Sequence, residues 1–161
     1  MRQADLRTVV AQQWHVLRQR GDRSPDPRLQ AITDLGAELA VHQANQRSIC
    51  IIGDCNEDIG HDPSLLASLC SKYDLVDVMD ILHPEQASIP SYARSSNRLD
   101  YVLLSQDLLG YADSAGLNHY HDFYHSNHRP IFAVLARRLV VSLPSVSRHL
   151  SRYVQSTSKM V

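Results

Sequence analysis

The sequence predicts one α/β domain, and three observations support this prediction. Segments with apolar residues at helical spacing alternate with short, continuous apolar runs of strand length. The 161 residues, 43% of them apolar, are enough to build one hydrophobic core. After residue 136 the chain becomes basic and serine-rich, with only weak amphipathic spacing. We therefore expect one domain over residues 1–136 and a basic linker or frayed helix over residues 137–161.

Two amphipathic helices are expected at the start of this domain. From Asp5 to Arg20, apolar residues recur at intervals of three and four, and Gly21 with the proline-rich cluster behind it ends the pattern. The same spacing returns from Arg28 to about Asn45, with polar residues between the apolar ones. Each segment therefore has one apolar face that can cover a sheet.

Three apolar runs predict strands. Residues 48–53 form a continuous apolar run that closes on Gly53, which is typical of a strand buried on both faces. Residues 100–104 and residues 130–135 have the same character, the latter after a leading proline. We expect all three strands to lie in one mixed central sheet that helices cover.

A third helix and a short extended segment lie between these strands. The sequence Asp62-Pro63-Ser64 opens the helix, with Pro63 at a plausible first position, and the apolar spacing runs to about Lys72. Residues 75–78 are then expected to be extended. The resulting order of elements is helix, helix, strand, helix, strand, strand.

Charge argues against a broad basic face that grips nucleic acid. The formal net charge is −1, and from residue 137 onward there are five basic residues and no acidic ones, so the domain itself is acidic. An acidic body suits a pocket of carboxylates that holds a cation. The basic tail either contacts nucleic acid or is a solvated charged segment. No stretch approaches the ~20 apolar residues of a membrane span, so we expect no membrane partner.

The cysteines favour a reduced, intracellular compartment, either nuclear or cytoplasmic. Cys50, Cys55 and Cys70 are odd in number, and no apolar leader precedes them. All three lie in or beside apolar runs, so we expect them to be small buried hydrophobic residues.

Polar clusters lie at the ends of the predicted strands, where α/β proteins build their sites. The carboxylates are Asp54 and Asp100, and the clusters also hold Asn56, Arg98 and His128. Hydrolysis of a phosphate ester uses a hard cation, a carboxylate that orients water, and amide or imidazole donors that stabilise the growing negative charge. These residue types match that requirement.

Three motifs follow one another along the chain. They are Gly53-Asp54-Cys55-Asn56, then Arg98-Leu99-Asp100-Tyr101-Val102, then Ser126-Asn127-His128-Arg129-Pro130-Ile131. They resemble the endonuclease/exonuclease/phosphatase superfamily, also called DNase I-like, whose pattern is Gly-Asp-Phe-Asn, then Arg-Ile-Asp-Tyr-Ile, then Ser-Asp-His-Arg-Pro-Val. The likeness covers residues 49–135, and its helical lead-in is similar to retrotransposon endonuclease domains. It implies the C-terminal half of a four-layer α/β sandwich.

The resemblance also implies roles for single residues. Asp54 would orient the attacking water, Asn56 would bind a phosphate oxygen, and His128 would contact the phosphate. Asp100 would fix the imidazole, since a carboxylate beside a histidine sets its tautomer. The cofactor would be Mg²⁺ or Mn²⁺, and the substrate DNA, although the superfamily also contains lipid phosphatases and sphingomyelinases. Tyr92 and Arg98 are also expected to contact the substrate.

Two departures from the family pattern predict an impaired hydrolase. Asn127 stands where the family has a metal-binding Asp, and an amide weakens a site for a hard cation. The family's opening strands, with an Asn and the metal-binding Glu, are expected upstream, but a helix follows Met1 almost at once. A truncated half-domain would expose one sheet face, so self-association is expected. The alternative is an inactive remnant or binding module of the same fold.

Simpler interpretations stay open for each motif. Asp54 and Asn56 are turn-forming residue types, and Asp100 could cap a strand or pair with Arg98 on the surface. A histidine-rich zinc site is another candidate. Its residues would be His119, His121, His125, His128 and Asp122.

Overall fold

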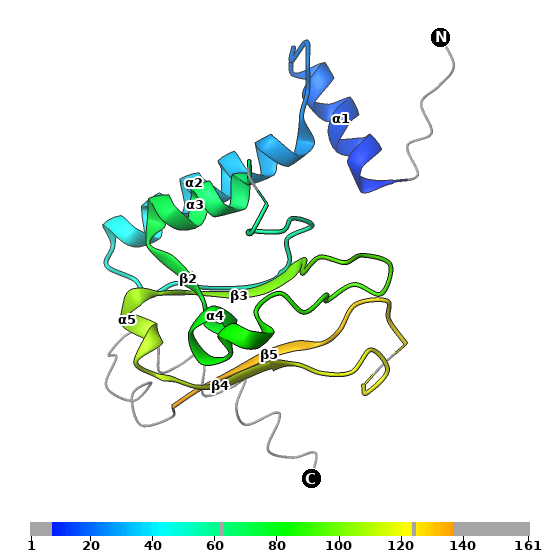
Figure 1. Cartoon of the computed structure of the whole chain (residues 1–161). Helices are drawn as coiled ribbons and strands as arrows, with labels where there is room; N and C mark the ends of the chain where they lie inside the picture. Colours follow the sequence, from blue (N-terminus) through cyan, green and yellow to red (C-terminus); the bar gives the residue numbers. More distant parts are fainter. Residues whose placement is uncertain (1–7, 62, 124, 137–161) are drawn as a thin grey trace.

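The computed structural model describes residues 8–61, 63–123 and 125–136 and has an α/β architecture with helices and antiparallel sheets. The predicted linker or frayed helix over residues 137–161 lies outside this range. Figure 1 labels the elements in chain order. They are α1 (Val9–Gln19), α2 (Pro27–Ala44), β1 (Cys50–Asp54), α3 (Leu65–Tyr73), β2 (Leu75–Asp77), α4 (Val78–Leu82), the 3₁₀ helix η1 (Pro84–Gln86), β3 (Asp100–Ser105), α5 (Gln106–Leu109), β4 (Ala112–Leu117) and β5 (Ile131–Leu135).

Strand β3 is the centre of a three-stranded sheet with the order β1-β3-β2, and both pairings are antiparallel. The register of β1 on β3 sets Asp54 opposite Asp100, so two carboxylate-bearing residues meet at the same end of the sheet. The N–H of Cys55 donates to the carbonyl of Leu99 and extends this pairing by one residue.

The prediction of one mixed sheet is wrong. Strand β5 pairs antiparallel with β4 in a separate two-stranded sheet, so it does not join β1 and β3. Strand β4 precedes β5 directly in the chain, and two such neighbouring strands can pair antiparallel as a hairpin without a long crossover. Strand β5 therefore pairs with β4. Figure 1 shows this hairpin below the three-stranded sheet.

The two faces of β3 bury two separate apolar clusters. Because strand side chains alternate, Tyr101 and Leu103 point toward α2 and α3, while Val102 and Leu104 point toward α4 and the β4-β5 hairpin. All four side chains are buried. The domain is therefore layered, with helices on one side of the central sheet and the hairpin with its short helices on the other.

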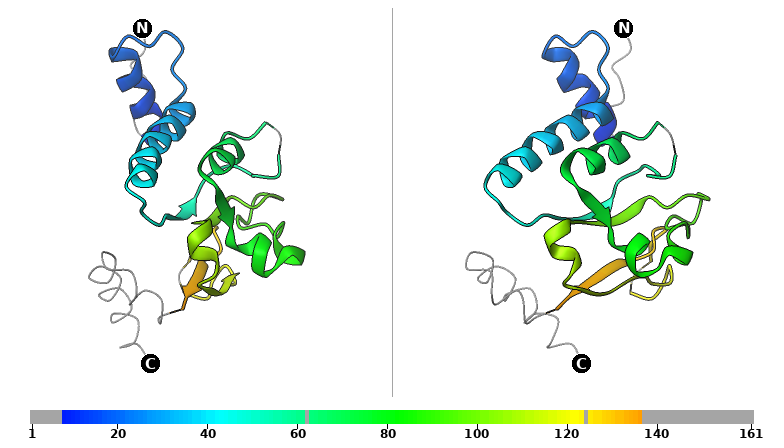
Figure 2. Two further views of the ribbon diagram at one scale, coloured as in Figure 1. Left: turned by 90° about the vertical axis from the view of Figure 1, so that its left-hand side faces the viewer. Right: turned by 60° about the vertical axis from the view of Figure 1, so that its left-hand side comes forward.

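Helices α2 and α3 lie side by side over the central sheet (Figure 1). Their close approach depends on Gly36, since a Cβ there would come within 3.3 Å of Leu69. The hydroxyl of Tyr73 donates to the carbonyl of Gly36 at 2.6 Å across the same contact. Figure 2 shows that α1, in contrast, reaches away from the rest of the domain, and only Leu17 of that helix is buried.

Side-chain caps place two helix starts differently from the prediction. Helix α1 begins at Val9, because the side chain of Thr8 accepts from the N–H of Ala11. Helix α3 begins at Leu65, because Ser64 caps it by accepting from the N–H of Ala67 at 2.9 Å. Pro63 therefore precedes the cap and is not the first helical residue.

The cysteines are free, and they differ in burial. Cys70 is buried and Cys55 is half-buried, but Cys50 is exposed on β1, so the prediction of three buried cysteines is wrong for Cys50. Burial raises the pKa of the Cys55 and Cys70 thiols to about 11. No helix in the described part of the chain has the length and apolarity to cross a membrane.

Candidate functional site

The loop that leaves β1 holds the first two predicted site residues. Oδ1 of Asp54 accepts from the backbone N–H of Asn56 at 2.9 Å, and the Asn56 amide donates to Oδ2 at 3.2 Å. Asn56 adopts a left-handed φ of 50°, a conformation that asparagine tolerates better than most residues. The turn therefore holds the Asp54 carboxylate in place at the end of the strand.

The backbone of Asp100 is held in place by a buried serine, which the sequence analysis did not identify. The hydroxyl oxygen of the fully buried Ser91 accepts from the N–H groups of Leu99 and Asp100, at 2.8 and 3.0 Å. The Ser91 carbonyl also accepts from the N–H of Arg129 at 2.8 Å. Ser91 thus joins the backbones that carry Asp100 and His128, which are far apart in sequence.

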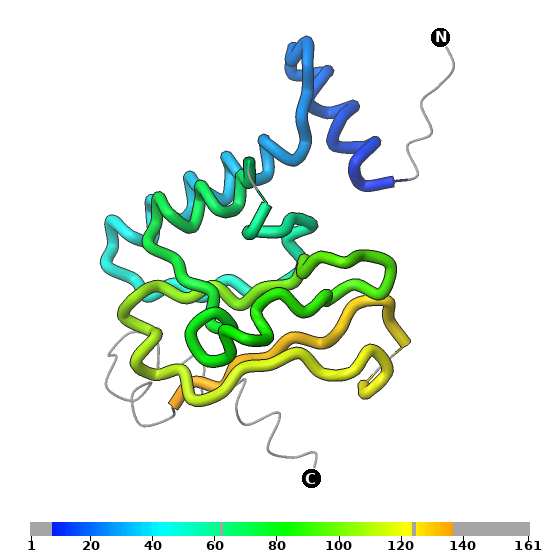
Figure 3. Tube along the Cα trace, in the orientation of Figure 1, coloured from blue at the N-terminus to red at the C-terminus, as the bar shows by residue number. Residues whose placement is uncertain are grey.

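His128 lies on a loop that runs beside residues 91–93. Tyr92 and His128 form a β-bridge, and the N–H of Ala93 donates to the carbonyl of Asn127 at 2.8 Å. Figure 3 traces the two chain segments next to each other. The pairing fixes the backbone of His128 just in front of the start of β3.

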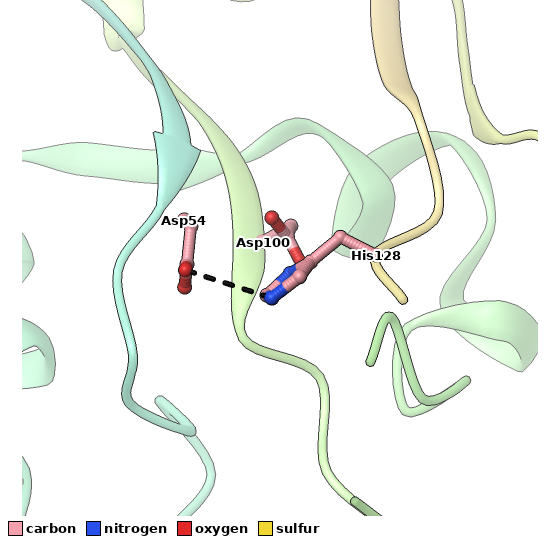
Figure 4. A group of neighbouring side chains, drawn as sticks. All are labelled: Asp54, Asp100 and His128. Atoms are coloured by element: carbon pink, nitrogen blue, oxygen red, sulfur yellow. Dashed lines mark hydrogen bonds and ion pairs between the residues drawn. The ribbon is translucent and has the colours of Figure 1, made fainter. Parts of the chain in front are cut away.

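Asp54, Asp100 and His128 converge into one group (Figure 4). Nδ1 of His128 lies 3.0 Å from Oδ2 of Asp100, within hydrogen-bond range, and Nε2 lies 3.8 Å from Oδ2 of Asp54. The Asp100 side chain is only 8% exposed, whereas His128 and Asp54 are 31% and 36% exposed. The imidazole is therefore anchored on its buried side and open to solvent on the side of Asp54.

Arg98 does not join this group, although it stands two residues before Asp100. Its guanidinium is buried, pairs with the equally buried Asp77, and lies 4.4 Å above the centre of the Tyr101 ring. Burial lowers the pKa of Arg98. The pair with Asp77 engages Nη2 of Arg98, whereas Nε and Nη1 have no hydrogen-bond partner among the described residues.

Tyr92 and Asn127 flank the group in different ways. The Tyr92 ring lies 4.7 Å from the His128 ring, centre to centre, with a tilt of 32°. Its half-buried side chain therefore supports one face of the imidazole. Asn127 is exposed, and its backbone carbonyl makes the contact with Ala93 described above.

Two further residues that sequence analysis did not identify fix the loop after Asp54. Glu57 accepts from the N–H groups of Leu65 and Leu66 at the start of α3, and from Arg28 at 3.0 Å. Partial burial alone would raise the pKa of Glu57, but these hydrogen bonds hold it below the ordinary value. The Tyr101 hydroxyl accepts from the N–H of Ile59 at 3.1 Å and ties the same loop to β3.

The histidine-rich segment, the alternative candidate for a zinc site, does not form such a site among the described residues. Neighbouring ring centres of His119, His121 and His125 are 5.6 to 6.3 Å apart, and within residues 8–61, 63–123 and 125–136 the candidate metal group consists of Asp54, Asp100 and His128 alone. Asp122 instead accepts from the backbone of His119. A hollow of about 520 Å³ beside α3 is lined by other residues than this group.

The local arrangement can hold an imidazole between two carboxylates and can present it to a ligand from solvent. The turn after β1, the buried serine and the paired loops all contribute to that geometry. Comparison with known proteins adds no family: no protein-family model matches this chain, and no curated protein matches it either.

Proposed function

We propose that this protein is a metal-assisted phosphodiester hydrolase of the endonuclease type, with Asp54, Asn56, Asp100 and His128 as its reactive residues. The observation that supports this most is the convergence of Asp54, Asp100 and His128, which come from three distant segments. A histidine held by a buried carboxylate and open on its other side is suited to proton transfer or to binding an anion.

Each residue has a task that its contacts support. Asp100 fixes the imidazole through Nδ1, so Nε2 faces the solvent side, where a phosphate oxygen would arrive. Asp54 is an exposed carboxylate next to that nitrogen and would orient water and accept its proton. The Asn56 amide, which contacts Asp54, would orient this carboxylate and donate to a substrate oxygen.

The donor set fits a divalent cation such as Mg²⁺ or Mn²⁺, because two carboxylates and an imidazole lie within 4.8 Å of one another. When bound, such an ion neutralises charge on the phosphate and polarises it. Asn127 supplies a neutral amide where a carboxylate would bind a hard cation more strongly. We therefore propose weak metal binding and slow turnover.

The finer family assignment is part of this proposal. We infer descent from the DNase I-like superfamily, with the chain equivalent to half of its four-layer sandwich and derived from a retroelement endonuclease. The motif order and the meeting of the three motifs at one sheet end support this. DNA is the proposed substrate, and a nuclear or cytoplasmic location would accompany it.

A catalytically inactive remnant or binding module of the same fold is the competing function. Asn127 favours it, since the amide removes a negative charge beside His128. Cleavage of supercoiled plasmid by the purified chain, with and without Mg²⁺ or Mn²⁺, separates the two. Activity that rises in Asn127→Asp and disappears in His128→Ala supports a hydrolase. If no version cleaves, while each keeps its circular dichroism spectrum, the remnant is the better description.

We also propose self-association through the open edge of β1. This strand pairs with β3 on one side only, and Ile52, at its middle, is 55% exposed. Apart from Asp54 at its end, β1 carries neither a charge nor a proline, and an edge strand of this kind is a template for pairing with another chain. Size-exclusion chromatography should show a larger species at high concentration, and Ile52→Lys should return it to the monomer. A monomer at all concentrations would contradict this.

A further inference from the structure

We propose that the junction between α1 and α2 binds the phosphate backbone of DNA beside the candidate site, through Arg18, Arg20 and Arg23. These three residues are called the arginine turn below. The inference rests on the proposed function for the use that is made of the bound DNA, but the binding itself can be measured without cleavage. It concerns a surface outside the group of side chains that forms the candidate site.

The distribution of charge supports this inference. Residues 29–136 hold 14 of the 17 acidic residues of the chain and only five basic ones, whereas residues 8–28 hold four arginines and two aspartates. Helix α1 itself has no acidic residue. DNA is a polyanion, so most of the domain repels it. A site that acts on DNA therefore needs a local cationic surface, and in the described part of the chain the arginine turn supplies one.

The guanidinium groups of the arginine turn are available to a ligand. All three side chains are exposed, and none forms an ion pair with a carboxylate of the described residues. The guanidinium of Arg18 lies 3.9 Å above the centre of the Trp14 ring. Stacking of this kind leaves the N–H groups free, because they point outward in the plane of the guanidinium. The neighbouring Asp22 carboxylate instead accepts from the backbone N–H of Ser24 at 2.9 Å.

Contacts of Arg28 connect the arginine turn to the candidate site. Arg28 lies in the first turn of α2, where its Nη2 donates to the carbonyl of Cys55 at 3.4 Å and pairs with Glu57 at 3.0 Å. Cys55 directly follows Asp54 at the end of β1. Arg23 precedes Arg28 by five residues, so their backbones are at most ~18 Å apart. Figure 1 shows α1 projecting from this end of α2.

The chemistry of the arginine turn and its position favour the DNA backbone as the ligand. Arginine binds phosphate oxygens through paired N–H groups, and such contacts fix the position of a nucleic acid without reading its sequence. An anionic lipid surface offers phosphates too, and the exposed Val9 and Val10 of α1 would suit it. DNA is the better fit, because the arginine turn adjoins a site suited to phosphodiesters and one DNA molecule can contact both.

The expected size of the effect follows from counterion release. Each phosphate that a cation neutralises contributes about −0.9 to the slope of log affinity against log salt concentration. Three arginine contacts therefore contribute about −2.7, which is a loss of affinity of about 40-fold between 50 and 200 mM salt. Because the contacts are to the backbone, this contribution should be the same for DNA of any sequence.

The experiment is a titration of a labelled DNA duplex with the full chain, followed by fluorescence anisotropy at several salt concentrations. EDTA is present, so that metal-dependent cleavage does not disturb the measurement. Each of Arg18→Gln, Arg20→Gln and Arg23→Gln should make the salt slope shallower by about 1, and the triple variant by about 2.7. Arg47→Gln is the matched control, because Arg47 is an exposed arginine just beyond the other end of α2. It should leave affinity and slope unchanged.

A measurement on the unmutated chain guards against variants that fail to fold. Trp14 is the only tryptophan of the chain and lies against Arg18, so its fluorescence reports on the arginine turn directly. DNA should change this emission over the same concentrations that change the anisotropy. DNA binding without a change in Trp14 emission would overturn the inference.

Two other outcomes would also overturn it. An unchanged salt slope in the triple variant would assign DNA binding to other basic residues, such as those after position 136. Tighter binding to vesicles of phosphatidylserine and phosphatidylcholine than to DNA would assign the arginine turn to a lipid surface.

The proposed function can fail separately from this inference. If DNA binding depends on the arginine turn but Mg²⁺ or Mn²⁺ supports no cleavage, the proposed function fails and the DNA-binding surface stands. If the triple variant cleaves plasmid with the same rate and the same salt dependence as the unmutated chain, the hydrolase stands and the inference fails.

Discussion

Two side-chain pairs, each with one carboxylate, meet at the start of β3, and they differ in their access to water. Arg98 pairs with Asp77 where both side chains are at most 5% exposed. His128 pairs with Asp100, but its ring is 31% exposed and its second nitrogen faces the open carboxylate of Asp54. The first pair is closed, and the second has a free position for a ligand.

The difference shows that residue type alone does not separate a structural ion pair from a reactive one. Arg98 and Asp100 belong to the same motif and lie two residues apart, yet only Asp100 faces the candidate site. A closed pair contributes to the fold, because leaving either charge alone in the interior is costly. An open pair can exchange its partner for water, an ion or a phosphate. Variants of the two pairs should therefore change different properties.

The largest effect on stability is expected at the closed pair. Asp77→Asn would keep the cap that Asp77 gives to the N–H of Met79, but it would leave the buried Arg98 charge without its partner. Breaking a buried pair in this way costs about 3–5 kcal/mol. Chemical denaturation measures the loss. Asp80→Asn is the control, because Asp80 is 3.7 Å from Arg98 but 54% exposed, so its removal should cost less than about 1 kcal/mol.

A smaller effect is expected at Ser91, which supports the open pair from behind. Ser91→Ala removes the oxygen that accepts from two backbone N–H groups, and an unpaired buried donor costs about 1–3 kcal/mol. Thermal or chemical denaturation gives the value. Ser88→Ala, at an exposed position of the same loop, should change stability by less than about 0.5 kcal/mol. Equal losses of stability in the two variants would contradict a supporting role for Ser91.

The next smaller effect is the contribution of Glu57 to the pH dependence of folding stability. Its folded pKa lies below the ordinary value, so its contribution is present above the pKa of the unfolded chain and is lost as pH falls through the folded pKa. Glu57→Gln should cost about 1 kcal/mol at neutral pH, as for a lost helix cap, and almost nothing at strongly acidic pH. Denaturation of both proteins across this range tests the sign. A constant difference at every pH would contradict it.

The smallest effect on stability is expected at the open pair itself. His128→Asn removes a partner that is about one-third exposed, and water can then solvate Asp100, so the free energy of unfolding should change by less than about 1 kcal/mol. Metal binding and any cleavage should disappear in the same variant. A loss of stability as large as that of Asp77→Asn would mean that the two pairs are equivalent after all.

Much of the fold could be predicted from periodicity. The apolar runs at 48–53, 100–104 and 130–135 correspond to β1, β3 and β5, and the helical spacing at 28–45 corresponds to α2. Strand β4 was not predicted, because its sequence Ala-Asp-Ser-Ala-Gly-Leu has low strand propensity, and pairing with β5 makes it a strand. The separation into two sheets depends on tertiary pairing, which no local pattern encodes.

The candidate site was predictable as a set of residues but not as an arrangement. Asp54, Asn56, Asp100 and His128 follow from motif order, and the structure brings them together. The burial of Arg98 depends on Asp77, which lies on another strand and has no motif of its own. Ser91 and Glu57 act through backbone hydrogen bonds at a distance in sequence, so neither residue type nor spacing indicated them.

Helix α1 reaches away from the domain and buries little besides Leu17, which has a consequence for how the molecule unfolds. A helix of 11 residues has little stability of its own in water, and this one lacks the apolar contacts that hold α2 and α3 in place. Its amide hydrogens should therefore exchange with solvent through local opening, at a free energy well below that of the central sheet. The part of the chain that unfolds cooperatively is then expected to begin at α2, and α1 is expected to unfold separately.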